Sequence, residues 1–513
     1  MLKFEATALR PLAVACLAIA LAIVTPSVSA EPPVVGKTIA GMSPLERSLI
    51  ETEVSNKING VLRGLDFLDG QNGPIEVTSL LDAETGELLV DMGEAYGPQA
   101  TSLAMEDLHR GITEVAAGVL GETGDWTGVA LRFGGKDMYY WFPEERPREP
   151  SGRPKRSAAL GYNWPPAPIL LSAGHGAYYH KGWKAWTSQR DKSPYGVLED
   201  SITQDFVEEL DKALALNFLG ERRPDTPTFL TRSLSSELHE ASGRTWRELG
   251  ARYHLKELYP GNPEIWNSKP KSTDADSERI EDIYSRPLVA NHIKAAAAIH
   301  IHTNAWTPEA RGARFYYQAG NAEGKRLASA LACHVRELVH SKTEFADYVV
   351  EANARSANYA ELRAAEVPSA LVEIGYHTNQ KDSETMLDPE FRKVAMAGVR
   401  KGYQHFKADR GGCDPFKVSD IAYVSTFSGG VDIDVTFSGE PTWPMEVRLT
   451  DDEGTQTFTE LHWADIKGDR MRLIGECTWR GPQQNYKIEI LDRDQIKFDG
   501  SIVADCWSTA YRE

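Results

Sequence analysis

Strand-like and helix-like hydrophobic patterns alternate through the middle of the chain, between residues 167 and 409. Four short apolar runs have the length and composition of buried strands: Ile169–Ser172, Thr228–Thr231, Ile299–His302 and Ala370–Ile374. Between the first two of these runs, apolar residues recur every four positions, as on one face of a helix: Ile202, Phe206, Leu210 and Leu214. Strands that alternate with helices predict an α/β region whose largely parallel sheet is covered by helices on both faces.

The last hundred residues, 413–513, follow a different pattern. Apolar and polar residues alternate strictly at Val431, Ile433, Val435 and Phe437, and the same period returns from Tyr486 to Ile490. A period of two is typical of strands with one buried face. Several such strands separated by Gly, Pro and Asp predict a small β-sandwich-like accessory domain.

Residues 31–145 form a third pattern, with a helix expected over 100–120. Strands are expected at Ile75–Leu81, Leu88–Asp91, Val129–Phe133 and Met138–Phe142. We interpret this segment as a small α/β accessory domain without a chemical motif; it weakly resembles the GerMN-type domains that accompany envelope proteins. Residues 146–166 are rich in Pro and Arg and cannot bury much apolar surface, which indicates a linker.

The N-terminus has the features of a signal peptide over residues 1–30. Lys3 and Arg10 form a basic region before an apolar run, and small residues at Val28–Ala30 fit a cleavage site. The alternative is an uncleaved membrane anchor, for which the run is short. We therefore expect an exported protein, periplasmic or extracellular, with no membrane span after cleavage.

Charge and cysteine content restrict the partners further. The 513-residue chain has a formal net charge of -18, which argues against nucleic-acid binding and against a polybasic hold on anionic lipid. Cys333, Cys413, Cys477 and Cys506 follow the signal segment. An even number permits disulfides in an exported chain; Cys477 with Cys506 is the favoured pair, but the spacing leaves the pairing open.

Polar residues capable of metal binding or proton transfer stand at the ends of three expected strands. His175 follows the first, His302 ends the third, and Glu373 lies in the fourth, while Glu199 opens a helix at the same edge. Three of them have a structural alternative: His175 in a turn, His302 as a core histidine, and Glu199 as a favourable charge at the start of a helix. Glu373 is harder to explain, because an unpartnered carboxylate in an apolar strand is costly.

Taken together, the blocks around these residues resemble the zinc-dependent N-acetylmuramoyl-L-alanine amidase family, catalytic type 3. The resemblance covers about 240 residues and rests on five blocks in family order: Ile169–Gly176, Leu198–Asp200, Leu230–Arg232, Arg286 with Ala290–Asn291 and His300–Ala305, and Pro368–Asn379.

The resemblance implies one zinc ion bound by His175, Glu199 and His302, with Glu373 as the catalytic base. Two histidines and one glutamate leave a position open, as in catalytic rather than structural zinc sites. It further implies a substrate-contacting or ligand-supporting role for Arg286, Asn291 and Asn304. The implied reaction is hydrolysis of the amide between N-acetylmuramic acid and L-alanine in peptidoglycan. A zinc peptidase or amidase for another envelope amide, and a non-catalytic envelope-binding protein, remain as alternatives.

Two departures from the family pattern bear on this interpretation. His300 replaces a serine and lies on the same strand face as His302, as an alternate ligand or a supporting donor. The segments 177–198 and 233–285 are long and aromatic, and each is either a rim of the site or an elaborated edge of the fold. An activating envelope partner, the oligomeric state and a blocked resting site are left open.

Overall fold

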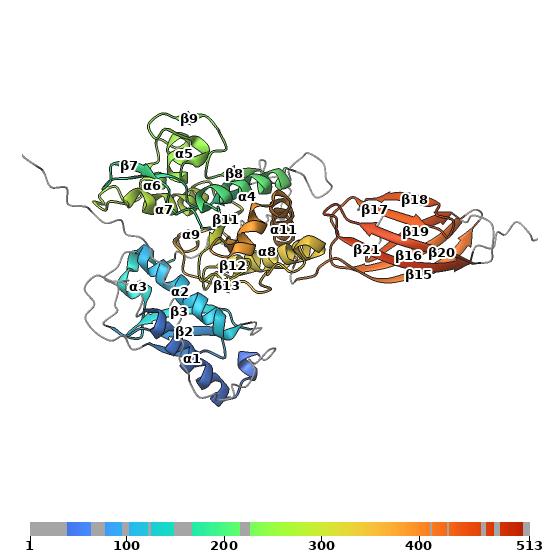
Figure 1. Cartoon of the computed structure of the whole chain (residues 1–513), viewed down its shortest axis with the longest axis horizontal. Coiled ribbons are helices and arrows are strands. Elements are labelled where there is room, and N and C mark those ends of the chain that lie inside the picture. Colours follow the sequence, from blue (N-terminus) through green and yellow to red (C-terminus); the bar gives the residue numbers. More distant parts are fainter. Residues whose placement is uncertain are drawn as a thin grey trace, which may run out of the picture.

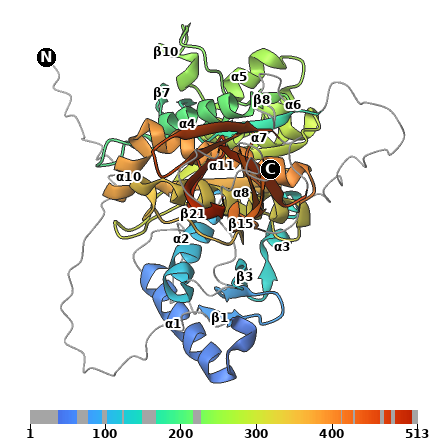
Figure 2. The same cartoon turned by 90° about the vertical axis from the view of Figure 1, so that its right-hand side faces the viewer.

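The computed structural model describes residues 38–62, 77–94, 102–121, 125–147, 167–215, 226–410, 413–427, 430–462, 468–476 and 483–505. Figure 1 shows an N-terminal body in blue, a central α/β region in green to orange, and a C-terminal β body in red at the far end. The turned view in Figure 2 keeps the N-terminal body on one side of the central region. The expected signal peptide and residues 148–166 of the expected linker lie outside the described residues.

A ten-stranded sheet runs through the first two bodies, in the order β1-β2-β3-β13-β12-β14-β11-β5-β8, with β4 beside β3. Its strands are β1 (Thr78–Leu81), β2 (Glu87–Asp91), β3 (Gly128–Phe133), β4 (Lys136–Asp137), β5 (Ile169–Ala173), β8 (Thr228–Leu230), β11 (Ala297–Asn304), β12 (Arg314–Tyr317), β13 (Arg355–Ser356) and β14 (Ser369–Tyr376). The four strands expected from the sequence, β14, β11, β5 and β8, are mutually parallel, whereas β12 is antiparallel to β14.

Helices cover both faces of the central sheet, which confirms the predicted α/β class. On one face, Ile169 and Leu171 of β5 pack in a core with α4 (Glu199–Leu214), α8 (Ala322–Ser341) and α11 (Pro389–Lys407). The intervening Leu170 points to the other face, in a core with α5 (Ala251–Leu258), α6 (Pro263–Trp266) and α7 (Ser277–His292). This alternation follows from the pleat of the strand.

The N-terminal body adds α1 (Pro44–Leu62) and α2 (Ser102–Leu120) to the first four strands. Its sheet joins the central one where Ser356 of β13 pairs in parallel with Gly128 of β3. The strand expected at Met138–Phe142 is wrong: residues Met138–Trp141 form the short helix α3. The side chain of Asp137 accepts a hydrogen bond from the backbone N–H of Tyr140, and this N-cap overrides the β propensity of the aromatic run.

The C-terminal body consists of two antiparallel sheets, ordered β15-β16-β19 and β18-β17-β20-β21. Their bounds are β15 (Lys417–Phe427), β16 (Gly430–Ser438), β17 (Met445–Thr450), β18 (Gln456–Leu461), β19 (Arg470–Glu476), β20 (Gln483–Leu491) and β21 (Lys497–Asp505). A disulfide joins Cys333 of α8 to Cys413, just before the first of these strands. The favoured pair, Cys477 with Cys506, lies outside the described residues.

The remaining elements are short. They are η1 (Ile39–Gly41), η3 (Pro143–Glu145), β6 (Tyr178–His180), β7 (Ala185–Thr187), β9 (Leu238–His239), β10 (Arg244–Thr245), η4 (Trp246–Glu248), η5 (Thr343–Phe345), α9 (Ala360–Arg363) and α10 (Gln380–Leu387). Within the described ranges, no helix has the length and apolar character needed to cross a membrane.

Candidate metal centre

His175 stands in the loop that follows β5 and is flanked by two glycines. Its backbone adopts a left-handed conformation, with φ 57°, which is uncommon for a residue with a side chain. A Cβ atom on Gly174 would lie 2.5 Å from Nδ1 of His302, so only glycine lets that imidazole come so close. The Gly-His-Gly loop therefore both presents His175 and leaves room for the imidazole of His302.

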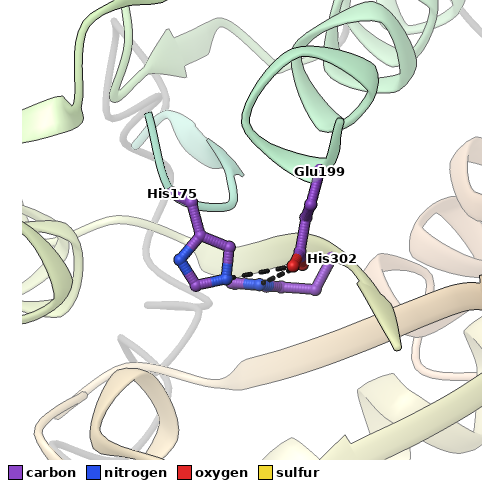
Figure 3. A group of neighbouring side chains, drawn as sticks. All are labelled: His175, Glu199 and His302. Atoms are coloured by element: carbon purple, nitrogen blue, oxygen red, sulfur yellow. Dashed lines mark ion pairs between the residues drawn. The ribbon is translucent and has the colours of Figure 1, made fainter. Parts of the chain in front are cut away.

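Glu199 and His302 come from neighbouring elements of the same sheet edge. Glu199 is the first residue of α4, and His302 lies near the end of β11. Oε1 of Glu199 lies 3.4 Å from Nε2 of His175 and 3.3 Å from Nδ1 of His302. One ligand atom from each of the three residues falls within 4.8 Å of the others, and Figure 3 shows the two rings converging on the carboxylate. The backbone N–H of Thr303 also donates to Oε1, at 2.9 Å.

The donor set suits a catalytic zinc ion. Two imidazole nitrogens and one carboxylate oxygen form the three-ligand set of zinc hydrolases, which leaves one coordination position for water or substrate. All three side chains are buried. Because the three buried polar groups face one another, they could hold a cation between them.

Without a metal ion, the pKa values of the two histidines shift in opposite directions. Burial lowers the pKa of His175 to about 3, with a contribution from the charge of Arg190. Burial also acts to lower the pKa of His302, but Glu361 and Glu199 outweigh it and raise the pKa to about 10. A proton on His302 thus balances two buried carboxylates, and a divalent cation in the site would supply that positive charge instead.

Glu373 faces the same cavity from the neighbouring strand. In the parallel register of β11 and β14, Glu373 is directly opposite His302, so both side chains lie on the same face of the sheet. Its Oε2 atom is buried and forms no hydrogen bond with any described residue. Burial raises the pKa of Glu373 to about 7, close to the value best suited to a general base at neutral pH.

The second nitrogen of His302 is fixed by Glu361, a residue of α9. Nε2 of His302 lies 2.7 Å from Oε2 of Glu361, whose other oxygen accepts from Nη1 of Arg286 at 2.7 Å. With its proton on Nε2, the ring presents the bare Nδ1 to the metal position. A carboxylate behind a ligand histidine sets the tautomer and raises the basicity of the ligand nitrogen.

The second nitrogen of His175 is held by Gln189, in the aromatic segment 177–198. Oε1 of Gln189 lies 3.2 Å from Nδ1 of His175, and its Nε2 donates to Oδ2 of Asp282 at 2.7 Å. The same carboxylate oxygen accepts from Nη2 of Arg286 at 2.7 Å. Arg286 therefore connects the supports of both histidines in one buried hydrogen-bond circuit.

Glu361, Gln189 and Asp282 were not expected from the sequence pattern. Gln189 lies in a segment without periodicity, and Glu361 is in a helix of four residues, so no local pattern marks either side chain. The only available signal was chemical: ligand histidines almost always have a carboxylate, carbonyl or water on the other nitrogen.

The supporting residues expected from the family pattern lie at different distances from the centre. His300 is buried outside the three-residue group, with Nε2 3.2 Å from Oγ of Ser369 and Nδ1 3.6 Å from Oε1 of Glu361. Asn291 ties the end of α7 to the chain before β14: it donates to the carbonyl of Ala364 and accepts from the N–H of Glu366.

Asn304 contacts the N-terminal body instead of the cavity. Its Nδ2 donates to Oε1 of Glu114 in α2 at 3.0 Å. The cavity itself has a volume of about 70 Å³, and its lining includes Glu106 and Arg110 of α2 besides the three ligand candidates and Glu373. A segment far from the family blocks thus reaches the candidate site.

The chain matches a known protein family over part of the region that holds this site. Residues 261–404 match the sequence model of the family described as N-acetylmuramoyl-L-alanine amidase, a range that includes His302 and Glu373 but not His175 or Glu199. The chain is 24% identical over 144 residues to the germination-specific N-acetylmuramoyl-L-alanine amidase of Bacillus subtilis (strain 168). That alignment covers 28% of this chain and 58% of the relative, less than two thirds of its length.

Two solved structures illustrate the structural similarity. The CwlD amidase of Clostridioides difficile, determined in complex with the GerS lipoprotein, is 18% identical with a TM-score of 0.32, covering 48% of this chain and 100% of that one. The N-acetylmuramyl-L-alanine amidase Ami1 of Mycobacterium smegmatis is 17% identical with a TM-score of 0.32, covering 48% of this chain and 98% of that one.

Proposed function

We propose that this chain, whose central region belongs to the N-acetylmuramoyl-L-alanine amidase family, hydrolyses the amide between N-acetylmuramic acid and L-alanine in peptidoglycan. The observation that carries the proposal is the pairing of a candidate three-residue metal-binding group with a buried carboxylate whose Oε2 atom forms no hydrogen bond with a described residue. His175, Glu199 and His302 face one another, and Glu373 lies opposite His302 on the next strand.

In this proposal His175, Glu199 and His302 hold one zinc ion, and Glu373 is the base. When bound, zinc polarises the scissile carbonyl and lowers the pKa of an attacking water. Glu373 accepts a proton from that water as the oxygen adds to the carbonyl carbon. It then donates the proton to the departing nitrogen as the C–N bond breaks. The products are a lactyl carboxylate on the sugar and a free amino group on L-alanine.

The remaining residues act through these four. Glu361 and Gln189 hold the two imidazoles in the tautomers that leave Nδ1 of His302 and Nε2 of His175 free for the metal. Arg286 fixes both supports. These are positioning residues, because they act on the proposed ligands through hydrogen bonds.

We place the reaction outside the cytoplasm, in an exported protein. Peptidoglycan lies outside the cytoplasm, and the signal-peptide pattern of residues 1–30 supports export to the periplasm or cell exterior. We assign residues 31–145 and 413–513 to accessory domains, 146–166 to a linker and 167–409 to the catalytic domain. Nucleic acid is not a partner in this proposal, because the chain carries a net charge of -18.

The test combines metal analysis with product identification. Purified protein is loaded with zinc, and soluble muropeptides are analysed by mass spectrometry before and after incubation. We expect one zinc ion per chain, and stem peptides released with a free L-alanine amino group. Glu373→Gln should keep its zinc and lose hydrolysis, by about 1,000-fold or more, since it removes the proton acceptor.

A matched control uses Glu337, a glutamate whose side chain is 4% exposed, which pairs with His334 and Lys401 and is not part of the cavity lining. Glu337→Gln should retain hydrolysis as long as it is folded. Cleavage at a different amide would replace the muramoyl-alanine assignment by another amidase or peptidase activity. Absence of both zinc and hydrolysis in folded protein would instead favour a non-catalytic envelope-binding protein.

A further inference from the structure

Three arginines line the cavity at the metal centre, and each comes from a different segment whose role the sequence leaves open. Arg110 belongs to α2 of the N-terminal body, Arg190 to the aromatic segment 177–198, and Arg279 to the segment 233–285. Segments distant in sequence thus each bring a guanidinium group to the same cavity. This convergence indicates that they share a task at the site.

The helix that carries Arg110 is fixed against the central region on one side by Glu106. Oε1 of Glu106 accepts from the backbone N–H of Ala360 at 2.8 Å and lies 3.4 Å from Nη2 of Arg363. Arg363 is almost fully buried and also pairs with Glu145 at 3.0 Å. This contact joins α2 to α9, the helix that supplies Glu361, as the neighbouring positions of α2 and α9 in Figure 1 illustrate.

A second attachment lies two turns further along α2, at Glu114. Its carboxylate accepts from Nδ2 of Asn304 at 3.0 Å and from the hydroxyl of Tyr376 at 2.7 Å, and it pairs with Arg314 at 2.5 Å. All four side chains are buried. Removing one partner from such a cluster is strongly destabilising, so Arg110, between Glu106 and Glu114, is held in place rather than carried on a mobile surface.

The acidic groups of the cavity are already engaged by the protein. Glu106 has the contacts just described, Glu361 is bound by His302 and Arg286, and Glu199 belongs to the metal-binding group. Glu373 is the only other carboxylate in the lining. The lining contains four carboxylates and three guanidinium groups. A divalent cation would add two positive charges, so that the positive charges would exceed the negative ones by one. The cavity would then favour an anionic ligand.

The arginines are close enough to act on the centre. Burial is the main influence on the pKa of Glu373, and the charge of Arg110 is among the influences that lower it. Nε of Arg190 lies 3.5 Å from Oε2 of Glu199. Nη2 of Arg279 pairs with Oδ2 of Asp276 at 3.4 Å, whereas its Nε is buried and makes no hydrogen bond with a described residue. Guanidinium groups in such positions bind carboxylates through paired, charge-assisted hydrogen bonds.

We propose that Arg110, Arg190 and Arg279 form a carboxylate-binding rim that selects peptides with a free carboxylate next to the L-alanine residue. The inference rests on the proposed amidase function and names what that site recognises. It also gives the N-terminal body a direct part in substrate binding, because Arg110 enters the cavity from α2.

The experiment measures binding and hydrolysis separately on matched ligands, with zinc-loaded full-length protein. Calorimetry compares two product peptides that begin with L-alanine and differ only in whether the α-carboxyl group of the second residue is free or amidated. Steady-state kinetics compares the two corresponding muropeptides. Arg110→Ala and Arg279→Ala are the test variants. Arg190 is left intact because it borders a proposed zinc ligand, and exposed Arg336 on α8 gives the control Arg336→Ala.

We expect the unmodified protein to bind the free carboxylate about 10- to 100-fold more tightly than the amide, the range for charge-assisted hydrogen bonds. Arg110→Ala and Arg279→Ala should each reduce this preference, mainly through KM, and leave zinc content unchanged. Arg110→Lys should restore part of it. Arg336→Ala should behave like the unmodified protein.

The outcomes separate this inference from the proposed function. Hydrolysis of both muropeptides at equal kcat/KM, with equal binding of both peptides, overturns the rim while the amidase assignment stands. Equal losses on both ligands in Arg110→Ala also overturn it, because they indicate a structural effect. Discrimination in calorimetry without hydrolysis of either muropeptide supports the rim and rejects the amidase reaction.

Discussion

Substitution of Glu361 by glutamine isolates the support of one proposed zinc ligand. Glu361 accepts from His302 with one oxygen and from Arg286 with the other, both at 2.7 Å. Glutamine has nearly the same shape but only one acceptor oxygen. If that oxygen faces His302, the amide N–H group meets the guanidinium of Arg286, donor against donor. If it faces Arg286, the amide donates to Nε2 of His302 and moves the ring proton to Nδ1.

Either orientation weakens the zinc site. In the first, a donor clash disturbs the circuit that fixes both histidines; in the second, the metal-facing nitrogen of His302 carries a proton. Loss of such a support reduces metal affinity by about 10- to 100-fold, equivalent to about 1.4–2.7 kcal/mol. Burial opposes charge on Glu361, but His302, Arg286 and His300 hold its pKa well below the usual range, so a full negative charge is removed.

The assay is competition for zinc against a chromophoric chelator at pH 7.5, with thermal unfolding of the metal-free proteins as a check on folding. Glu337→Gln, which removes a similarly buried charge between His334 and Lys401, is the control. We expect its zinc affinity to equal that of the unmodified protein. A Glu361→Gln protein that is folded and binds zinc within about threefold of the unmodified protein would refute the positioning role.

Three further predictions follow from the geometry. Gly174→Ala places a Cβ 2.5 Å from Nδ1 of His302 and should displace that ring beyond the ±0.2 Å tolerance of a metal bond. Zinc affinity, measured by competition, should therefore fall at least about tenfold. An unchanged affinity would contradict the close approach of the ring to Gly174. Burial raises the pKa of Glu373 to about 7, and the carboxylate accepts a proton only when it is ionised. Because bound zinc would lower this pKa, kcat/KM should fall as the pH drops below a midpoint at or under about 7. A kcat/KM that stays constant down to pH about 4 would argue against Glu373 as the base. Replacing both Cys333 and Cys413 by alanine opens a loop with a sequence separation of 80 and should lower the free energy of unfolding by up to about 4–5 kcal/mol in denaturant titrations, whereas an unchanged midpoint shows that the bond adds nothing.

Much of the central region could be predicted from its hydrophobic pattern. Runs of apolar residues define β5, β8, β11 and β14, and the helical repeats between them require a parallel sheet. In a parallel sheet the carboxyl ends of the strands meet at one edge. That rule brings His302 and Glu373 together, and the structure places them opposite each other.

Local patterns were less informative where caps and long-range pairs decide the structure. The aromatic run from Met138 has strand propensity, yet the cap formed by Asp137 makes it a helix. Cys333 bonds to Cys413 because the packing of α8 brings their Cα atoms within 5.4 Å, a distance that sequence spacing does not reveal.

The sequence by itself determined the four parallel strands of the central sheet, because these depend on periodicity. The candidate metal-binding group of His175, Glu199 and His302 was indicated by the resemblance to the amidase family, which rests on the residue types in its sequence blocks. Only the tertiary structure decided what surrounds that group. Glu361 lies 59 residues from His302, and Glu114 lies 190 residues from Asn304. Such partners have no shared period, since they meet through packing of whole elements, and the same packing brings Arg110 into the cavity.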